Sequence, residues 1–210
     1  MIFSSTLFLF RFLPITLLCY YIVPKKWKNP VILFFSLFFY SWGEVKYFPI
    51  MVLAILVNYL AALGIARFDQ KPWLRRLFFL IALFVSLGQL FFFKYYNFFS
   101  RNIEGLTGLS LPLVKLALPL GISFYTFQTL TYTVDVYRRK VSAERNLINF
   151  ATFVVLFPQL IAGPIVKYTD IDKELKDRTI SLKQVEDGVK LFIFGLGKKV
   201  LIANNIGLFW

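Results

Sequence analysis

Residues Tyr47 to Ala66 read YFPIMVLAILVNYLAALGIA, twenty residues in a row without a charge. A membrane-spanning helix needs about 20 mostly apolar residues, so this stretch is long enough to cross a bilayer. The rest of the chain has the same character: 58% of its 210 residues are hydrophobic, 20% are aromatic, and the mean hydropathy is +0.67. Soluble domains are only about 45–50% apolar. The sequence therefore predicts an all-α, polytopic integral membrane protein.

Six other apolar segments are predicted to enter the membrane. They lie near residues 2–23, 29–43, 77–93, 116–137, 148–166 and 189–210. Pro158, Gly163 and Pro164 interrupt one of these segments, which predicts a broken or re-entrant path buried in protein. The chain stops within an apolar run at Trp210. We therefore expect residues 1–210 to be the N-terminal part of a single membrane domain.

The basic residues alternate between successive connections. The connections at residues 24–28, 67–76 and 138–147 together carry eleven Lys and Arg, and the intervening ones carry four. Because Lys and Arg are retained on the cytoplasmic side, the N-terminus is predicted to lie outside a bacterial inner membrane. The net charge of +13 is explained by this pattern without a nucleic-acid partner. Residues 167–190, with six basic and six acidic residues, fit only if 148–166 dips in and returns.

Two local signals mark the ends of predicted elements. Ser181 and Gln184 form a capping-box pattern before a run of apolar residues at helical spacing, which predicts an amphipathic helix leading into the last segment. Gly105 and Gly108 suggest an outer loop after the segment at 77–93.

The chain contains no histidine and a single cysteine, Cys19. These 210 residues therefore hold no Ser-His-Asp or Cys-His nucleophile system and no zinc site with a histidine ligand. An intramolecular disulfide is impossible. We expect neither a catalytic residue nor a metal site nor a tightly bound cofactor within this chain.

Residues 118–137 carry a polar stripe through an otherwise apolar segment. Tyr125, Gln128, Tyr132 and Asp135 lie at helical positions i, i+3, i+7 and i+10. An Asp facing lipid at mid-bilayer costs about 2.5–3.5 kcal/mol on insertion scales, so the stripe is predicted to face protein or a water-filled cavity. Either it lines a substrate passage, or it makes hydrogen bonds between helices, with Asp135 pairing to Arg138 or Arg139.

Other polar residues are candidates for binding. Gln159, in the interrupted segment, either binds a donor or acceptor group or satisfies carbonyl groups left free by Pro158. Lys198 and Lys199 follow two glycines, but the spacing differs from that of a phosphate-binding loop. They either snorkel to the membrane surface or bind an acidic partner. Basic candidates for a donor or partner site are Arg138, Arg139, Lys198 and Lys199.

Several motifs resemble one family, in order along the chain. They are MIFSS at 1–5, FLF at 8–10, FLP at 12–14, KYYNFF at 94–99, LPLGISFY at 118–125, DVYR at 135–138, PQLIAGPI at 158–165 and GKKVLIA at 197–203. With these motifs the chain resembles the start of a bacterial membrane-bound O-acyltransferase of the alginate O-acetyltransferase branch.

The resemblance implies a ring of membrane helices, here incomplete, around a thinned membrane centre. It implies transfer of an acyl group, usually acetyl, from a cytoplasmic thioester (acetyl-CoA or a phosphopantetheine carrier) to a cell-surface or exported polysaccharide. Implied partners are the lipid bilayer, the polysaccharide and a periplasmic or membrane-anchored acetylation protein. The family's catalytic histidine lies in the C-terminal half and matches no position here, so this part alone is expected to be inactive. A non-catalytic docking subunit and part of a transporter or flippase remain alternatives.

Overall fold

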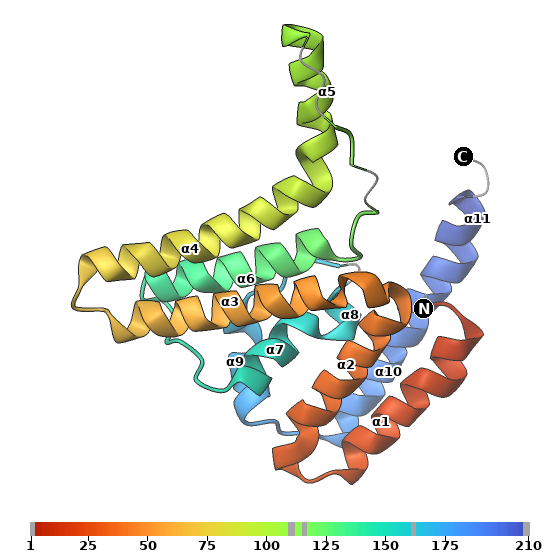
Figure 1. Ribbon diagram of the computed structural model, residues 1–210. Helices are drawn as coiled ribbons and strands as arrows, with labels where there is room; N and C mark the ends of the chain where they lie inside the picture. Colours follow the sequence, from red (N-terminus) through yellow and green to blue (C-terminus); the bar gives the residue numbers. More distant parts are fainter. Residues whose placement is uncertain (1–2, 109–111, 115–116, 161–162, 208–210) are drawn as a thin grey trace.

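The structure of the protein is a computed structural model that describes residues 3–108, 112–114, 117–160 and 163–207. Every regular element in these ranges is a helix (Figure 1). Two helical stretches, Lys25–Arg67 and Pro72–Thr107, are long and apolar enough to cross a membrane. The predicted all-α membrane fold is therefore confirmed. The parts of the predicted segments at residues 2, 116, 161–162 and 208–210 lie outside the described residues.

The N-terminal helices pack through aromatic side chains. A π-helical turn at Phe8–Phe12 runs into α1 (Leu13–Ile22), and a short turn at Lys25–Trp27 leads into α2 (Lys28–Glu44). Rings from three segments form one cluster, consisting of Phe8, Phe12, Phe39 and Phe157. Edge-to-face and offset ring pairs of this kind add about 0.5–1.5 kcal/mol each beyond their buried area. The cluster joins the first two helices to the later interrupted segment.

Helices α3 (Phe48–Arg67), α4 (Pro72–Leu90) and α6 (Ile122–Tyr137) lie side by side (Figure 1). One buried amide joins all three. The Asn58 side chain donates to Ser86 Oγ at 3.0 Å, and its oxygen accepts from Thr133 Oγ1 at 3.2 Å. Buried polar groups need such partners, especially where lipid replaces water. The bonds hold the three helices in one register.

The stretch after α4 corrects two expectations. The helix continues past residue 93 through a π-helical turn, Phe91–Tyr95, into α5 (Tyr96–Thr107), which projects away from the other helices (Figure 1). The predicted outer loop at 105–108 is therefore wrong. Gly108 ends α5 in the left-handed region, at φ +72°, and its N–H donates to the Glu104 carbonyl. A glycine after the last helical residue is a common helix end, because it adopts positive φ without strain.

The fifth predicted segment becomes helical later than expected. Helix α6 begins at Ile122 rather than near residue 116. Pro119 cannot donate a helical hydrogen bond, and Gly121 adopts φ +71°, so residues 117–121 are not helical.

The interrupted segment is broken, as the prolines predict. Helix α7 (Leu147–Val155) is followed by Leu156, whose ψ of 110° is not helical, and α8 (Phe157–Leu160) begins at the next residue. Pro158 lacks the N–H that would continue α7, and the freed Phe157 N–H donates to Ser36 Oγ instead, at 3.2 Å. The chain then reaches α9 (Tyr168–Lys176).

The last elements are α10 (Leu182–Gly197), a π-helical segment at Lys198–Ala203 and α11 (Asn204–Ile206). The predicted capping box is confirmed, because Ser181 Oγ accepts from the Gln184 N–H and the Gln184 side chain accepts from the Ser181 N–H. Helix α10 buries none of its side chains against the described part of the chain, and Leu182 is 90% exposed.

Candidate functional site

Helix α6 is fixed at its start by a close contact that only glycine permits. Gly121 has φ +71°, and a Cβ at this position would lie 2.6 Å from the Leu160 carbonyl oxygen. That distance is too short for any other residue, and the positive φ is costly for one. The first turn of α6 therefore lies directly against the end of α8.

The polar face of α6 is turned into the protein. Tyr125, Gln128 and Tyr132 are at most 1% exposed and Asp135 is half-buried, whereas Phe127 on another face is 41% exposed. This confirms that the stripe does not face lipid. The structure also divides the stripe into two environments, one at α8 and one at the connection that follows α6.

The first environment brings together two predicted residues. Gln128 Nε2 donates to Gln159 Oε1 at 3.3 Å, joining α6 to α8. Gln159 is half-buried, and its own backbone N–H donates to the Leu156 carbonyl. The side-chain amides of α6 and of the interrupted segment thus meet in the protein interior.

Three buried polar atoms of α2 and α6 have no hydrogen-bond partner among the described residues. They are Tyr40 Oη, Tyr125 Oη and Gln128 Oε1, and we call these side chains the tyrosine–glutamine cluster. Each residue is at most 1% exposed, and the two tyrosines belong to the same buried core. An unsatisfied buried polar group costs about 1–3 kcal/mol. The cluster offers two O–H donors and one carbonyl acceptor, the set that binds a hydroxyl or carbonyl group.

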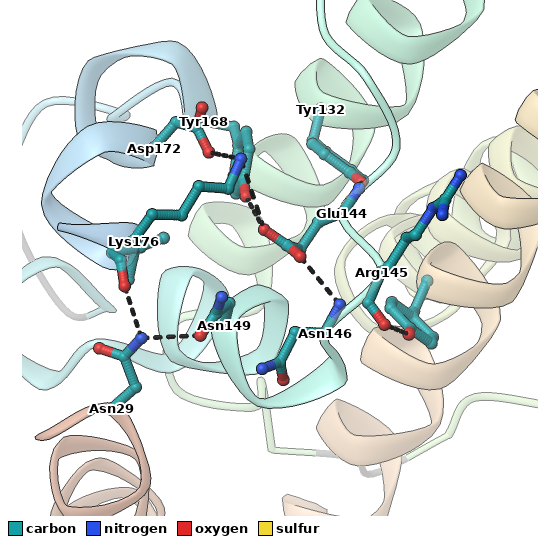
Figure 2. A network of polar contacts seen from close by, with 11 residues as sticks. Asn29, Tyr132, Glu144, Arg145, Asn146, Asn149, Tyr168, Asp172 and Lys176 are labelled. Atoms are coloured by element: carbon teal, nitrogen blue, oxygen red, sulfur yellow. Dashed lines mark hydrogen bonds and ion pairs between the residues drawn. The ribbon is translucent and has the colours of Figure 1, made fainter. Parts of the chain in front are cut away.

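The second environment is centred on Glu144, which the sequence analysis did not single out (Figure 2). The Glu144 N–H donates to Tyr132 Oη at 2.8 Å, and its carboxylate accepts from Tyr168 Oη at 2.6 Å and from the Asn146 N–H at 2.8 Å. Lys176 Nζ lies 3.9 Å from the same carboxylate. Glu144, Tyr132 and Tyr168 are all buried, and these contacts join α6, α9 and the start of α7. Tyr132 therefore serves this junction and not the tyrosine–glutamine cluster.

Helix α9 is also bonded to the start of α2. Asn29 at the start of α2 donates to Asn149 Oδ1 at 2.7 Å and to the Leu175 carbonyl at 2.8 Å (Figure 2). The interrupted segment thus begins just after Glu144, and the residue just after its end, Tyr168, lies within hydrogen-bond distance of Glu144 again. Both ends of residues 147–167 lie at the same end of the helices.

The protonation states of Tyr168 and Lys176 favour the contact of α9 with Glu144. Burial, with the hydrogen bond to Glu144, raises the pKa of the Tyr168 hydroxyl, so that it remains a proton donor. A hydrogen bond to Asp172, at 2.5 Å, raises the pKa of Lys176. Lys176 is therefore a cation wherever α9 is folded.

The four basic candidates lie in two separate places. Arg139 Nε is 3.0 Å from Asp69, so its partner is Asp69 and not Asp135, which corrects one pairing considered for the stripe. Arg138 is exposed beside it. Lys198 and Lys199 are exposed on the π-helical segment after α10, which packs mainly with its neighbours in sequence, α10 and α11.

An open pocket of about 1430 Å³ lies where α3, α4 and the connection after α6 meet. Its apolar wall includes Leu60, Leu63 and Phe78. Its charged lining consists of Arg67, Asp69, Arg139, Glu144, Arg145 and Lys176. Among the described residues no three His, Cys, Asp or Glu side chains gather as metal ligands would.

Sequence reasoning missed Tyr40, Glu144 and Tyr168. Glu144 is one acidic residue among basic neighbours, which is ordinarily a solvated side chain. It is separated from Tyr168 by the whole of α7 and α8, and no local periodicity connects the two. Only the return of the interrupted segment brings them together.

The chain was compared with known proteins. It is 39% identical, over 99% of its length, to "Probable alginate O-acetylase AlgI" of Pseudomonas syringae pv. tomato, and 36% identical, over 98%, to the protein of that name in Pseudomonas aeruginosa. It is 34% identical, over its full length, to "Peptidoglycan O-acetyltransferase" of Helicobacter pylori. The chain spans 40–46% of the length of these relatives.

No family model and no solved structure matches the chain. The similarity to each curated relative nevertheless extends over 98–100% of this sequence, and so over nearly the whole region that carries the motifs quoted above. The chain is therefore similar throughout to part of the bacterial O-acetyltransferases of the alginate O-acetylase kind, which confirms its resemblance to membrane-bound O-acyltransferases.

Proposed function

We propose that the protein carrying this chain transfers an acetyl group to hydroxyl groups of a cell-surface or exported polysaccharide. The observation that carries the proposal is the similarity, over nearly the whole chain, to relatives named for acetylation of alginate or of peptidoglycan. Alginate and peptidoglycan are both glycans, so the shared chemistry is an ester formed on a sugar hydroxyl. The 210 residues contain no histidine, so the family's catalytic histidine is not among them.

The proposed setting is a bacterial inner membrane crossed several times, with the N-terminus outside. The basic connections at 24–28, 67–76 and 138–147 support this orientation, and ion pairs bring all three to one end of the structure: α9 and the residue after it contact the first and the third, and the third contacts the second. Lys25 is 4.0 Å from Asp177 just after α9, Lys176 is 3.9 Å from Glu144, and Arg139 pairs with Asp69. Placing this end in the cytoplasm satisfies the positive-inside rule. Residues 147–167 then enter from the cytoplasmic side and return to it.

This chain would supply scaffold and passage for the reaction. A cytoplasmic thioester, acetyl-CoA or a phosphopantetheine carrier, would approach the basic end, where positive potential raises the local concentration of phosphate groups. The tyrosine–glutamine cluster, with Gln159, lies deeper between α2, α6 and α8 and would hydrogen-bond a group passing through the membrane interior. Asp135, near the basic end of α6, would line the entrance. A periplasmic or membrane-anchored protein is the proposed partner on the acceptor side.

Gene deletion tests the proposed reaction. Ester-linked acetate is released by mild alkali from the exopolysaccharide and from the peptidoglycan of deletion and complemented strains, and is then quantified. Loss of acetate from one glycan, restored by the wild-type gene, is the expected result. Unchanged acetate in every glycan fraction would contradict the proposed activity.

A further inference from the structure

The open pocket between α3, α4 and the connection after α6 combines an apolar wall with unpaired cations. Arg67 and Arg145 line it, and neither guanidinium has a hydrogen bond or an ion pair among the described residues. Figure 2 shows the Arg145 side chain directed away from the carboxylate of the preceding residue, Glu144. Two free guanidinium groups in one pocket favour an anion with several oxygens, such as a phosphate.

The carboxylates of the pocket are already engaged. Asp69 lies 3.5 Å from Arg75 and 3.0 Å from Arg139. Glu144 accepts from Tyr168 and from a backbone N–H. These contacts leave Arg67 and Arg145 available to a ligand from outside the chain.

A row of apolar side chains on α3, called the α3 lane below, leads to this pocket. Leu53, Leu56, Leu60, Leu63 and Arg67 recur at spacings of three and four residues, which puts them on one helix face. Leu53, Leu56 and Leu60 are 57%, 38% and 60% exposed, respectively. Exposed leucines along one face of a helix suit contact with acyl chains, and this row ends at Arg67, which lines the pocket.

We propose that this pocket binds an anionic phospholipid, with its phosphate between Arg67 and Arg145 and one acyl chain along the α3 lane. A phosphate joined to a long apolar chain matches both parts of the surface, whereas a soluble phosphate would use only the arginines. The proposal concerns a site separate from the tyrosine–glutamine cluster and does not depend on acetyl transfer.

Lipid titration of the full-length protein in neutral detergent tests the site. Native mass spectrometry measures binding of phosphatidylglycerol and of phosphatidylcholine to the wild-type protein and to Arg67→Gln, Arg145→Gln and the double variant. Each basic residue near a membrane surface contributes about a fivefold change in affinity for an anionic lipid, so the double variant should lose roughly 25-fold. Arg76→Gln is the matched control, because Arg76 is exposed nearby but does not line the pocket.

The expected result is tighter binding of phosphatidylglycerol than of phosphatidylcholine, a preference that the double variant loses and Arg76→Gln retains. Equal affinity for the two lipids, or an equal loss in Arg76→Gln, would overturn the proposal. A parallel titration with inorganic phosphate separates the two sources of phosphate. If the double variant lost only phosphate binding and kept its lipid affinity, the pocket would belong to a soluble ligand and the lipid proposal would be wrong. Because no acetyl donor is present, neither failure bears on the proposed acetylation.

Discussion

Replacing Tyr168 with Phe should loosen α9 while leaving its packing in place. The ring of Tyr168 is 1% exposed and packs edge-to-face against Tyr132 and Phe153, at centroid distances of 5.0 and 5.3 Å. Phe keeps these ring contacts and removes only the hydroxyl that donates to Glu144 at 2.6 Å. The experiment therefore isolates one buried hydrogen bond to a carboxylate.

The size of the effect follows from the chemistry of that bond. A hydrogen bond to a charged group contributes about 1.5–3 kcal/mol, and Glu144 is buried, so water replaces the lost donor poorly. A loss of about 2 kcal/mol corresponds to a roughly 30-fold larger population in which α9 is detached. The Asn146 N–H still donates to Glu144, which keeps the change local.

Hydrogen exchange monitored by mass spectrometry measures this opening directly. Amide groups of residues 168–176 should exchange about 30-fold faster in Tyr168→Phe, while those of α3 should be unchanged. Tyr95→Phe is the matched control, since Tyr95 is 40% exposed. In a double-mutant cycle, Tyr168→Phe should have much less effect when Glu144 is already Gln. Exchange within twofold of wild type in Tyr168→Phe would refute the assigned bond.

Three further predictions concern other parts of the molecule. Gln128→Leu in the full-length protein should lower polysaccharide acetylation about tenfold at normal protein level, because it removes the amide that joins α6 to α8. Phe127→Leu, on the exposed face of α6, is the control and should leave acetylation unchanged. Equal acetate in the two strains would argue against a substrate passage at Gln128. Gly121→Ala should lower the free energy of unfolding by about 2 kcal/mol or more, from positive φ and the contact with the end of α8, seen as a lower thermal midpoint than that of Gly105→Ala. Above about pH 10 the attachment of α9 should weaken progressively, because burial raises the pKa of Tyr168 in the folded state and the unfolded state loses this proton first. Tyr168→Phe should reduce this pH dependence of amide exchange, and the remainder should come from Lys176, whose pKa Asp172 raises.

The sequence predicted the elements that local chemistry determines. The apolar run at 47–66 became α3, Ser181 and Gln184 capped α10 as expected, and Pro158 broke the interrupted segment. Each of these depends on residues within one or two turns of each other: hydropathy, a side-chain cap, or a missing N–H donor. The inward orientation of Gln128 was also predictable, because an amide facing lipid is costly.

Features that depend on distant residues were not predictable. Helix α5 extends through Gly105, since nothing near that glycine forces a turn and the helix ends only at Gly108. Tyr132 looked like its neighbours on the polar stripe, yet its partner is Glu144, reached only through the connection after α6. The prolines of residues 147–167 and the charges after them predict that this segment returns, but the point to which it returns, Glu144, depends on tertiary contacts.

Accessibility of single cysteines tests most directly whether residues 147–167 enter and leave on the same side of the membrane, as proposed above. Single cysteines are introduced at Ser142, Lys173 and Glu104, all exposed, in a Cys19→Ser background, and reacted with a membrane-impermeant maleimide. The cysteines at 142 and 173 should react in inverted vesicles and not in spheroplasts, while the one at 104 should react in spheroplasts. Labelling of positions 142 and 173 from opposite faces would contradict a return to the same side.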